Sequence, residues 1–544
     1  MTEAKRGYSD LHEHLEALKE RGLLLTVDRP IDKDAELHPL VRWQFVGGLP
    51  EHERKAFLFT NVTDGRGRRY SIPVVVGAIA ANRAIYGVGM GVPVEEIQAR
   101  WERAIANPIA PRIVDGAVCQ DVVIEGAALR GEGHGLDRLP IPISTPGFDS
   151  APTLTATNVI TRDPETGVQN MGTYRAALKA PDRLVVRMAT RVGGAGGYVH
   201  YLEHQKRGDP AMPCAIVLGC PPCVAFMGPQ KLPIGVDELG VAGGLAGGPI
   251  NVVRARTVDL LVPAEAEIVI EGLIDTEYVE PEAPFGESHG HVALEEFNMP
   301  MRVTAITHRR NPIIPSYISQ VTPSESSVIK RVAYEPLFLA HLRDALGIRG
   351  VKRVTLHEPL TGLLRVTVIT IAKGTPRTEV WRALYGAAYF KGDCGKICLA
   401  VNDDIDPDNG DALLWALAYR MNPVEDAQTL PHRGQGHGPK REHDQEEDST
   451  LLMDATMKGD LPPLALPKKE YMERARAIWE ELGLPRLQPQ HPWFGYSLGD
   501  WLPEWDEAAK RAVEGRYLEN GRISEEYRRK GIKPETKFRP DRER

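Results

Sequence analysis

Near the start of the chain, hydrophobic residues have the spacing of a short helix followed by a strand. Leu11, Leu15 and Leu18 fall on one helical face, and the predicted helix has Ser9 as its cap and ends at Gly22. The five residues after Gly22 are apolar or β-branched, which is typical of a strand. A second helical stretch and further alternation follow. This pattern predicts an α/β domain that extends to about residue 130.

From about residue 136 the periodicity changes to that of short strands separated by turns. Frequent short strands of this kind favour an antiparallel, barrel-like sheet. A glycine cluster at 193–197 is expected to be a loop that leads into a helix over 198–207. The predicted strands cover residues 153–161, 169–178, 184–188, 215–219, 250–256, 267–273, 301–308 and 313–319.

Helical and strand patterns alternate in the C-terminal part of the chain. A long helix over about 326–346 is expected to connect two domains. A strand over 364–371, a helix over 379–389, a strand over 396–401 and a helix over 412–421 then follow. This alternation is typical of an α/β domain. Residues 430–450 are rich in Gly, His and charge, and form either a mobile loop or lid or a disordered segment. Three tryptophans of the polar tail, Trp493, Trp501 and Trp505, are expected to anchor it to another surface.

The predicted fold is therefore a mixed α/β and β multidomain protein. It has an N-terminal α/β domain, a central split β-barrel domain and a C-terminal α/β domain joined by a long helix. The predicted boundaries are 1–130, 131–325, 326–348 for the connecting helix, 349–484, and 485–544 for a C-terminal extension.

Composition narrows the class of protein. The 544 residues are 42% hydrophobic and 26% charged, and no window of about 20 residues is apolar enough for a membrane span. The net charge of −8 argues against a nucleic-acid-binding surface. Six cysteines do not form a disulfide framework, and no secretory signal is apparent, so a cytoplasmic location is expected. The single CxxC motif, Cys220–Cys223, has no second pair to complete a zinc site.

Two motifs that suggest ligand binding fail on inspection. Residues 404–410 start like a calcium-binding loop, but Asn409 stands where glycine is needed and Trp415 where the bidentate glutamate is needed. A strand end followed by a helix cap is the better interpretation. The glycine clusters at 193–197 and 243–248 match neither a dinucleotide-binding motif nor a P-loop.

Two acidic residues, Glu282 and Glu287, flank an Ala-Pro-Phe-Gly bend. In a straight strand, residues five apart face opposite sides, but a bend can turn both toward one cavity. Two carboxylates held close together cannot both ionise cheaply, so one becomes a usable proton donor. An arginine between them would keep the other ionised. Taken alone, the segment is also compatible with a turn that carries two solvated acids.

Two further polar clusters lie upstream of this pair. Asn170–Arg175 places an arginine in a strand otherwise suited to the interior, where a charge needs a partner. Asp237 and Glu238 follow a segment rich in proline and glycine. Spacing alone does not join these clusters into one site.

Taken together, the motifs resemble those of the UbiD family of reversible decarboxylases. The resemblance covers most of residues 8–485. It rests on the segments 169–175 (QNMGTYR), 235–238 (GVDE), 262–272 (VPAEAEIVIEG), 282–287 (EAPFGE), 403–407 (DDIDP) and 454–456 (DAT). It implies prenylated FMN as cofactor, a separate flavin prenyltransferase that supplies it, and a C-terminal domain that forms homo-oligomers, either dimers or hexamers.

The resemblance also implies roles for particular residues. The family's Glu-Arg-Glu network falls on Glu282, Arg175 and Glu287. The family's Asn and Glu metal ligands, for Mn²⁺ or Mg²⁺ with K⁺ nearby, fall on Asn170 and Glu238, but its histidine is replaced here by Arg191. An arginine can itself span a phosphate and a carboxylate, so we expect Arg191 to replace the metal partly or wholly. The implied cofactor-binding residues are Asn170, Met171, Gly172, Thr173, Tyr174, Arg175, Thr190, Arg191, Glu238 and Lys396.

The implied activity is reversible, non-oxidative decarboxylation of an aromatic, heteroaromatic or α,β-unsaturated carboxylic acid, or of an aromatic acyl-CoA. Arg175 would bind the substrate carboxylate or position Glu282, and Glu287 would supply the proton. Small polar residues such as Ser288 and Thr190 are compatible with a roomy pocket. Two alternatives remain open, a non-catalytic flavin-binding subunit of a larger carboxylase and a hydrolase that uses the carboxylate pair.

Overall fold

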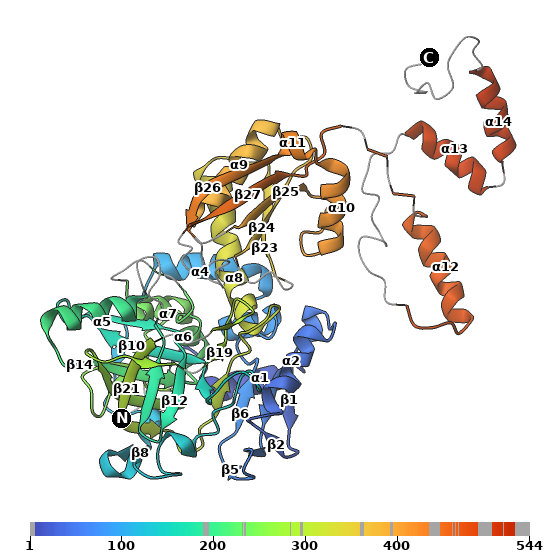
Figure 1. The fold of residues 1–544 in the computed structure, drawn as a ribbon. Coiled ribbons are helices and arrows are strands. Elements are labelled where there is room, and N and C mark those ends of the chain that lie inside the picture. Colours follow the sequence, from blue (N-terminus) through green and yellow to red (C-terminus); the bar gives the residue numbers. More distant parts are fainter. Residues whose placement is uncertain are drawn as a thin grey trace.

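The computed structural model describes most of the chain. The described residues are 6–188, 195–230, 232, 236–282, 284–293, 297–358, 364–391, 395–434, 447–459, 461–462, 464–465, 467–487, 503–514 and 516–527. Figure 1 shows a lower lobe that contains the N-terminal half of the chain and an upper lobe that contains β23 to β27. The helix α8 (Glu325–Ala340) connects the two lobes.

The first helix, α1 (Leu11–Glu20), buries the leucine face that the sequence predicts. Its cap differs from the expectation. Asp10, not Ser9, is the N-cap, because its carboxylate accepts the backbone N–H of Glu13 while Glu13 reaches back to Asp10. The other N-terminal helices are α2 (Leu37–Val46), α3 (Arg83–Met90) and α4 (Ile97–Ala106).

The N-terminal sheet includes one strand, β22, that comes from much later in the chain. Its order is β1 (Leu24–Val27), β3 (Ala56–Phe59), β6 (Val74–Val76) and β22 (Ile314–Ser316). β22 runs parallel to β6, with Ile314 opposite Val74. There are also two three-stranded sheets. One contains β2 (Ile31–Asp32), β4 (Val62–Thr63) and β5 (Arg69–Tyr70), and the other contains β7 (Arg112–Ile113), β15 (Asn251–Arg254) and β16 (Leu261–Pro263).

The central element is a ten-stranded, mainly antiparallel sheet. Its main path is β11 (Gln169–Gly172), β10 (Thr157–Arg162), β14 (Ala211–Leu218), β17 (Ile268–Asp275), β21 (Phe297–His308), β13 (Arg183–Val186), β12 (Ala176–Ala180) and β9 (Thr153–Leu154). β8 (Val122–Glu125) and β18 (Glu280–Pro281) pair with β21 off this path. Helices α5 (Gly196–Arg207), α6 (Pro222–Ala225) and α7 (Glu238–Ala246) accompany it.

The strands 153–161 and 169–178 that the sequence predicts are each broken in two. β9 and β12 pair with each other at one end of the sheet, whereas β10 and β11 pair at the other end. The hydrogen-bonded path among the described residues therefore does not close into a barrel. The covalent chain at 155–156 and 173–175 nevertheless joins the two ends.

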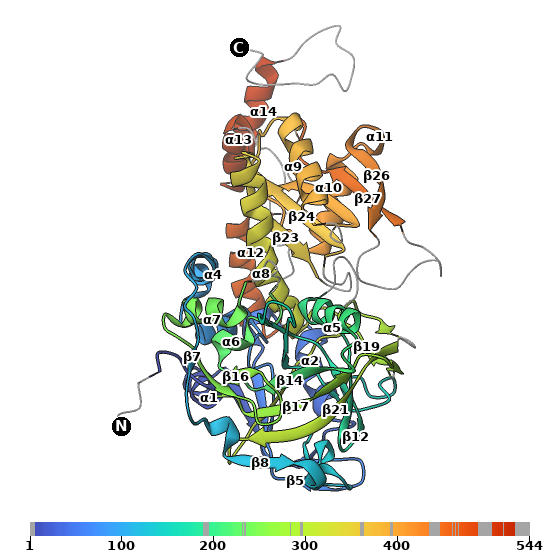
Figure 2. The same cartoon turned by 90° about the vertical axis from the view of Figure 1, so that its left-hand side faces the viewer.

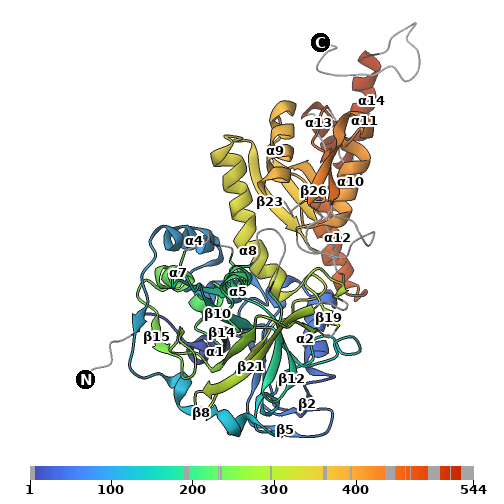
Figure 3. The ribbon, with the colours of Figure 1, turned by 60° about the vertical axis from the view of Figure 1, so that its left-hand side comes forward.

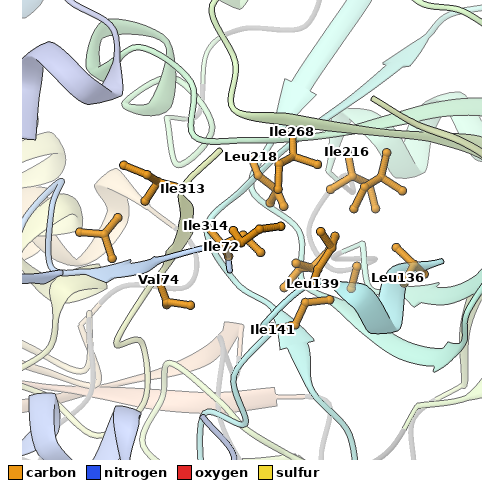
Figure 4. Packing of buried hydrophobic residues seen from close by; sticks show 14 of the residues in the cluster. Ile72, Val74, Leu136, Leu139, Ile141, Ile216, Leu218, Ile268, Ile313 and Ile314 are labelled. Atoms are coloured by element: carbon orange, nitrogen blue, oxygen red, sulfur yellow. The ribbon is translucent and has the colours of Figure 1, made fainter. Parts of the chain in front are cut away.

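The N-terminal sheet and the central sheet share one hydrophobic core. Ile72 and Val74 come from the first, Ile216 and Leu218 from the second, and Figure 4 shows them within one packed cluster. Removal of this apolar surface from water holds the two sheets together. Because β22 and β8 also cross the predicted boundary at residue 130, the two predicted domains pack as one lobe.

The C-terminal lobe contains a five-stranded sheet, and α8 runs beside it next to β23 (Figures 2 and 3). Its order is β23 (Val351–His357), β24 (Val366–Ile371), β25 (Ile397–Asn402), β27 (Glu447–Asp454) and β26 (Ala427–Gly434), with helices α9 (Arg377–Phe390), α10 (Gly410–Arg420) and α11 (Pro423–Asp426). Asn409 caps α10 and lies within the segment 404–410 that is predicted to contain a helix cap. Part of the segment predicted as a loop, 430–450, is strand, since β26 and β27 pair across it. Its central residues, 435–446, lie outside the described chain.

Three helices follow the C-terminal sheet. They are α12 (Lys469–Glu481), α13 (Pro503–Val513) and α14 (Tyr517–Glu526), and Figure 1 shows them set apart from both lobes. Trp505 is 38% exposed, whereas Trp493 and Trp501 lie outside the described residues. In the described parts of the chain, every helix is too short or too polar to cross a membrane.

Candidate active site

A pair of short strands forms the bend between the two acids. Phe285–Gly286 (β19) pairs with Val292–Ala293 (β20), and β18 just upstream pairs with β21. Gly286 packs so closely that an added Cβ would lie 2.3 Å from the Thr145 hydroxyl oxygen. A carboxylate oxygen of Asp149 accepts the Gly286 N–H at 2.9 Å. The bend is therefore fixed from behind, and Glu282 and Glu287 are both buried, with 5% and 6% exposure.

Arg175 lies between the two acids, as the resemblance implies. Its Nε and Nη2 donate to the two oxygens of Glu282 at 2.6 and 2.8 Å, a bidentate ion pair. Its Nη1 donates to Oε1 of Glu287. Burial alone would lower the pKa of Arg175, but the ion pairs with Glu287 and Glu282 raise it, so the guanidinium stays charged.

The connection between β11 and β12 places Arg175 between the two acids. Arg175 follows β11 and precedes β12, where the chain passes from one end of the sheet to the other. Its guanidinium carbon lies 4.5 Å from the centre of the Phe285 ring, a cation–π contact. The aromatic ring shields the ion pairs from water, which strengthens them.

Two neighbouring strands add polar groups to the same face. Arg187 follows β13, and its backbone N–H donates to the carbonyl of Arg175 at 3.0 Å, so the two arginines lie opposite each other. Nη1 of Arg187 lies 3.4 Å from Oε1 of Glu287. The next pair in the β13–β21 register is Arg187 with Asn298, and Nδ2 of Asn298 donates to Oε2 of Glu282 at 3.0 Å. Arg175, Arg187 and Asn298 thus lie side by side at the ends of, or within, three adjacent strands. The bend between Glu282 and Glu287 covers them on one side.

A second group of predicted residues forms a cradle beside Arg175. Nδ2 of Asn170 is buried without a hydrogen-bond partner, and Gly196 at the start of α5 packs against this side chain. Glu238 begins α7, and one of its oxygens accepts the Met171 N–H at 3.1 Å. Burial raises the pKa of Glu238 to about 7. The ionised form therefore favours a cation beside it, while the free Asn170 amide suits an anion.

The residues between Asn170 and Arg175 are held by close backbone packing. An added Cβ on Gly172 would overlap the Tyr174 ring at 2.4 Å, and one on Gly228 would lie 2.3 Å from the Thr173 hydroxyl oxygen. The Tyr174 hydroxyl accepts the Gly197 N–H at 3.3 Å, which links the strand to the start of α5. The cradle is lined by backbone at positions where only glycine fits.

One of the predicted cofactor residues, Lys396, lies apart from this group. Thr190 and Arg191 lie outside the described residues. Lys396 lies in the C-terminal sheet, where its ammonium pairs with Asp448 at 2.5 Å. Cys220 and Cys223 are buried free thiols, and no group of three potential metal-ligating His, Cys, Asp or Glu residues occurs within the described residues.

Arg187 and Asn298 are site residues that the sequence analysis missed. Arg187 interrupts the apolar strand 184–188, which is the same signal that identified Arg175. Asn298 lies in β21, three residues before the strand was predicted to start. A polar residue within an apolar strand pattern was therefore a usable signal for a site residue. Only the pairing of the strands, however, shows that these residues lie together.

Comparison with known families gives three consecutive matches along the chain. Residues 15–105, 112–321 and 328–455 match the N-terminal, Rift-related and C-terminal domains described as 3-octaprenyl-4-hydroxybenzoate carboxy-lyase. An uncharacterized protein of Archaeoglobus fulgidus is 26% identical over 508 residues, which cover 87% of this chain and 98% of that protein.

Solved structures give the same result. The UbiD-class enzyme HmfF from Pelotomaculum thermopropionicum in complex with FMN has 28% identity and a TM-score of 0.72, over 89% of this chain and 98% of that one. An evolved dimeric form of HmfF, in complex with prFMN, has 29% identity and a TM-score of 0.71, over 84% and 97%. Vanillic acid decarboxylase from Sedimentibacter hydroxybenzoicus shares the fold, with 22% identity and a TM-score of 0.69 over 88% and 100%. With all three domains matched in order, the chain belongs to the UbiD family of carboxy-lyases.

Proposed function

We propose that this protein removes carbon dioxide from an aromatic, heteroaromatic or α,β-unsaturated carboxylic acid, with prenylated FMN bound beside Arg175. The observation that carries the proposal is the buried Arg175 with Glu282 on one side and Glu287 on the other. A guanidinium in that position is suited to bind a carboxylate, and Glu287 is suited to give or take one proton.

The cradle fits the cofactor that the HmfF structures contain. The unpartnered Nδ2 of Asn170 and the helix starts at Gly196 and Glu238 suit a phosphate. Asn170–Arg175, Glu238, Thr190 and Arg191 would hold the cofactor, with Arg191 in place of part or all of the metal. When bound, prenylated FMN supplies the electron sink that no side chain offers.

The protein's own residues then have separate tasks. Glu282 holds Arg175 in its rotamer through two hydrogen bonds, and Asn298 holds Glu282. Arg175 orients the substrate carboxylate. Loss of carbon dioxide leaves an electron pair on the former carboxyl-bearing carbon, and Glu287 gives its proton to that carbon. Solvent restores the proton, so each turnover consumes one proton and releases one carbon dioxide.

The alternative of a carboxylate-pair hydrolase is less well supported. Such enzymes place a substrate and a water between two acids. Here a guanidinium bonded to both acids occupies that space. A non-catalytic subunit would have no need for the three network residues, all of which are present and in contact. We also propose that the protein assembles through its C-terminal lobe as a dimer or hexamer, which analytical sedimentation tests. We further propose a cytoplasmic location, which cell fractionation tests.

The test is co-expression with a flavin prenyltransferase and measurement of carbon dioxide release. The panel contains 4-hydroxybenzoate, vanillate, 3,4-dihydroxybenzoate, cinnamate, 2-furoate and the CoA ester of 4-hydroxybenzoate. Protein produced without the prenyltransferase is the matched control. Release that depends on the prenyltransferase supports the proposal. A protein that has the flavin absorption spectrum but is inactive on the panel, or activity without flavin, would contradict it.

A further inference from the structure

Arg175 and Arg187 form a like-charged pair directly across neighbouring strands. Like charges in this arrangement destabilise a sheet unless an anion lies between them. That anion is Glu287, since both guanidinium groups approach the same oxygen, Oε1. The side chains of Arg187 and Glu287 are only 16% and 7% exposed, so solvent does little to relieve the repulsion. An ionised Glu287 therefore stabilises the pair.

Arg187 also changes the charge balance of the site. Arg175 with Glu282 and Glu287 carries a net charge of −1, and Arg187 brings the cluster to zero. Among the other groups near the bend, Asp149 is bonded to the backbone of Thr145 and Gly286 on the far side. His291 contributes a backbone carbonyl to the Glu287 N–H, and its ring lies 5.9 Å from that of His289. A substrate carboxylate would return the cluster to −1.

We propose that Arg187 exchanges partners during substrate binding. It holds Glu287 ionised in the free protein and transfers its contact to the incoming substrate carboxylate, so that Glu287 takes a proton from solvent. Substrate binding and protonation of Glu287 are thus coupled. This inference rests on the proposed decarboxylase function.

The exchange balances protons over a turnover. One proton enters with the anionic substrate and is held on Glu287. After the bond to carbon dioxide breaks, the proton passes to the carbon that held the carboxyl group, and Glu287 returns as a carboxylate to the two arginines. No other reactant is needed. Without Arg187, the side chains of Arg175, Glu282 and Glu287 carry a net charge of −1, which favours a protonated Glu287 before substrate arrives.

Proton uptake on binding tests the idea without any turnover. Protein loaded with FMN is titrated calorimetrically at pH 7, in phosphate and in Tris, with the acid of the panel that binds most tightly. We expect the wild type to take up about one proton per site, and its affinity to fall about tenfold per pH unit above neutrality. Arg187→Met should take up almost none and bind about 10- to 100-fold more weakly, because a charge-assisted hydrogen bond is lost. Arg187→Lys keeps the charge and should restore most of the uptake.

Arg183→Met is the matched control. Arg183 lies on the same strand, is half exposed and pairs with Glu280 at 3.5 Å, so its loss should leave uptake and affinity unchanged. Zero uptake by the wild type, or equal uptake by wild type and Arg187→Met, would overturn the inference even if the protein is an active decarboxylase. A protein that neither binds nor decarboxylates any acid of the panel would instead refute the proposed function, and the inference with it.

Discussion

The bidentate pair between Arg175 and Glu282 leads to a quantitative prediction for Glu282→Gln. The carboxylate accepts two hydrogen bonds from Arg175 and a third from Asn298. A glutamine has one acceptor oxygen, so its amide nitrogen must face a donor of Arg175, and in one of the two amide orientations it faces the donor of Asn298 as well. At least one charge-assisted hydrogen bond is lost, which costs about 1.5–3 kcal/mol. If the loss falls on the transition state, kcat/KM drops about 10- to 150-fold.

The assay is carbon dioxide release by protein co-expressed with the prenyltransferase, normalised to the bound flavin measured by absorbance. Glu280→Gln is the matched control, because Glu280 lies two residues away and pairs only loosely with Arg183 at 3.5 Å. We expect the control to retain wild-type activity. The flavin content of Glu282→Gln should also be unchanged, because Glu282 lies outside the cradle of Asn170 and Glu238.

A second substitution should partly rescue the first. Asn298→Asp turns the donor that faces the glutamine amide into an acceptor, and it returns a negative charge close to Arg175. The double variant Glu282→Gln, Asn298→Asp is therefore expected to recover about tenfold of the lost kcat/KM. Full activity of Glu282→Gln, or a double variant less active than either single variant, would refute the view that Glu282 acts by holding Arg175.

Four further outcomes are expected. Glu287→Gln should lower kcat about 10²- to 10⁴-fold with little change in flavin content, because it removes the proton donor; turnover equal to wild type would remove that assignment. Gly196→Ala should reduce bound flavin, measured by absorbance, since its Cβ would strike Asn170. Elemental analysis of purified holoprotein should find sub-stoichiometric manganese or magnesium, and Arg191→His should raise it. Burial raises the pKa of Glu325 to about 7, so its ionisation costs stability as pH rises from about 4.5 to 7. Between pH 5 and pH 8, the unfolding free energy of Glu325→Gln should therefore gain about 2.5 kcal/mol relative to that of the wild type.

The order of the secondary structure elements could be predicted from the sequence, but the long-range strand pairing that joins the N-terminal and central parts into one lobe could not. Local periodicity located most strands, because alternation depends only on near neighbours. β22 joins the N-terminal sheet through pairing with β6, some 240 residues away. Nothing in the local pattern of Ile314–Ser316 distinguishes a strand that stays in the central sheet from one that leaves it.

The same limit explains the broken strands at the site. Residues 169–178 alternate as one strand would, yet β11 and β12 pair with different partners at opposite ends of the sheet. The break occurs at 173–175, and the Thr173 N–H leaves the ladder to donate to the Gly228 carbonyl at 3.0 Å. The close packing of Gly228 against Thr173 makes this possible, and it is a tertiary contact that no window of sequence contains.

Some residues of the candidate site could be identified from the sequence, whereas their partners could not. The two acids were recognisable because their spacing around a bend is local, and Arg175 because a charge in an apolar strand needs a partner. By that same reasoning Arg187 was visible in Leu-Val-Val-Arg-Met, but a lone arginine does not reveal whether its partner is structural or catalytic. The strand register gives this information, because it sets Arg187 opposite Arg175 and beside Asn298, where both guanidinium groups approach Oε1 of Glu287. A sheet that gained only stability from these positions would place an acid opposite one of the arginines. The two like charges across neighbouring strands are therefore the physical reason to expect a second anion, the substrate carboxylate, in the same place.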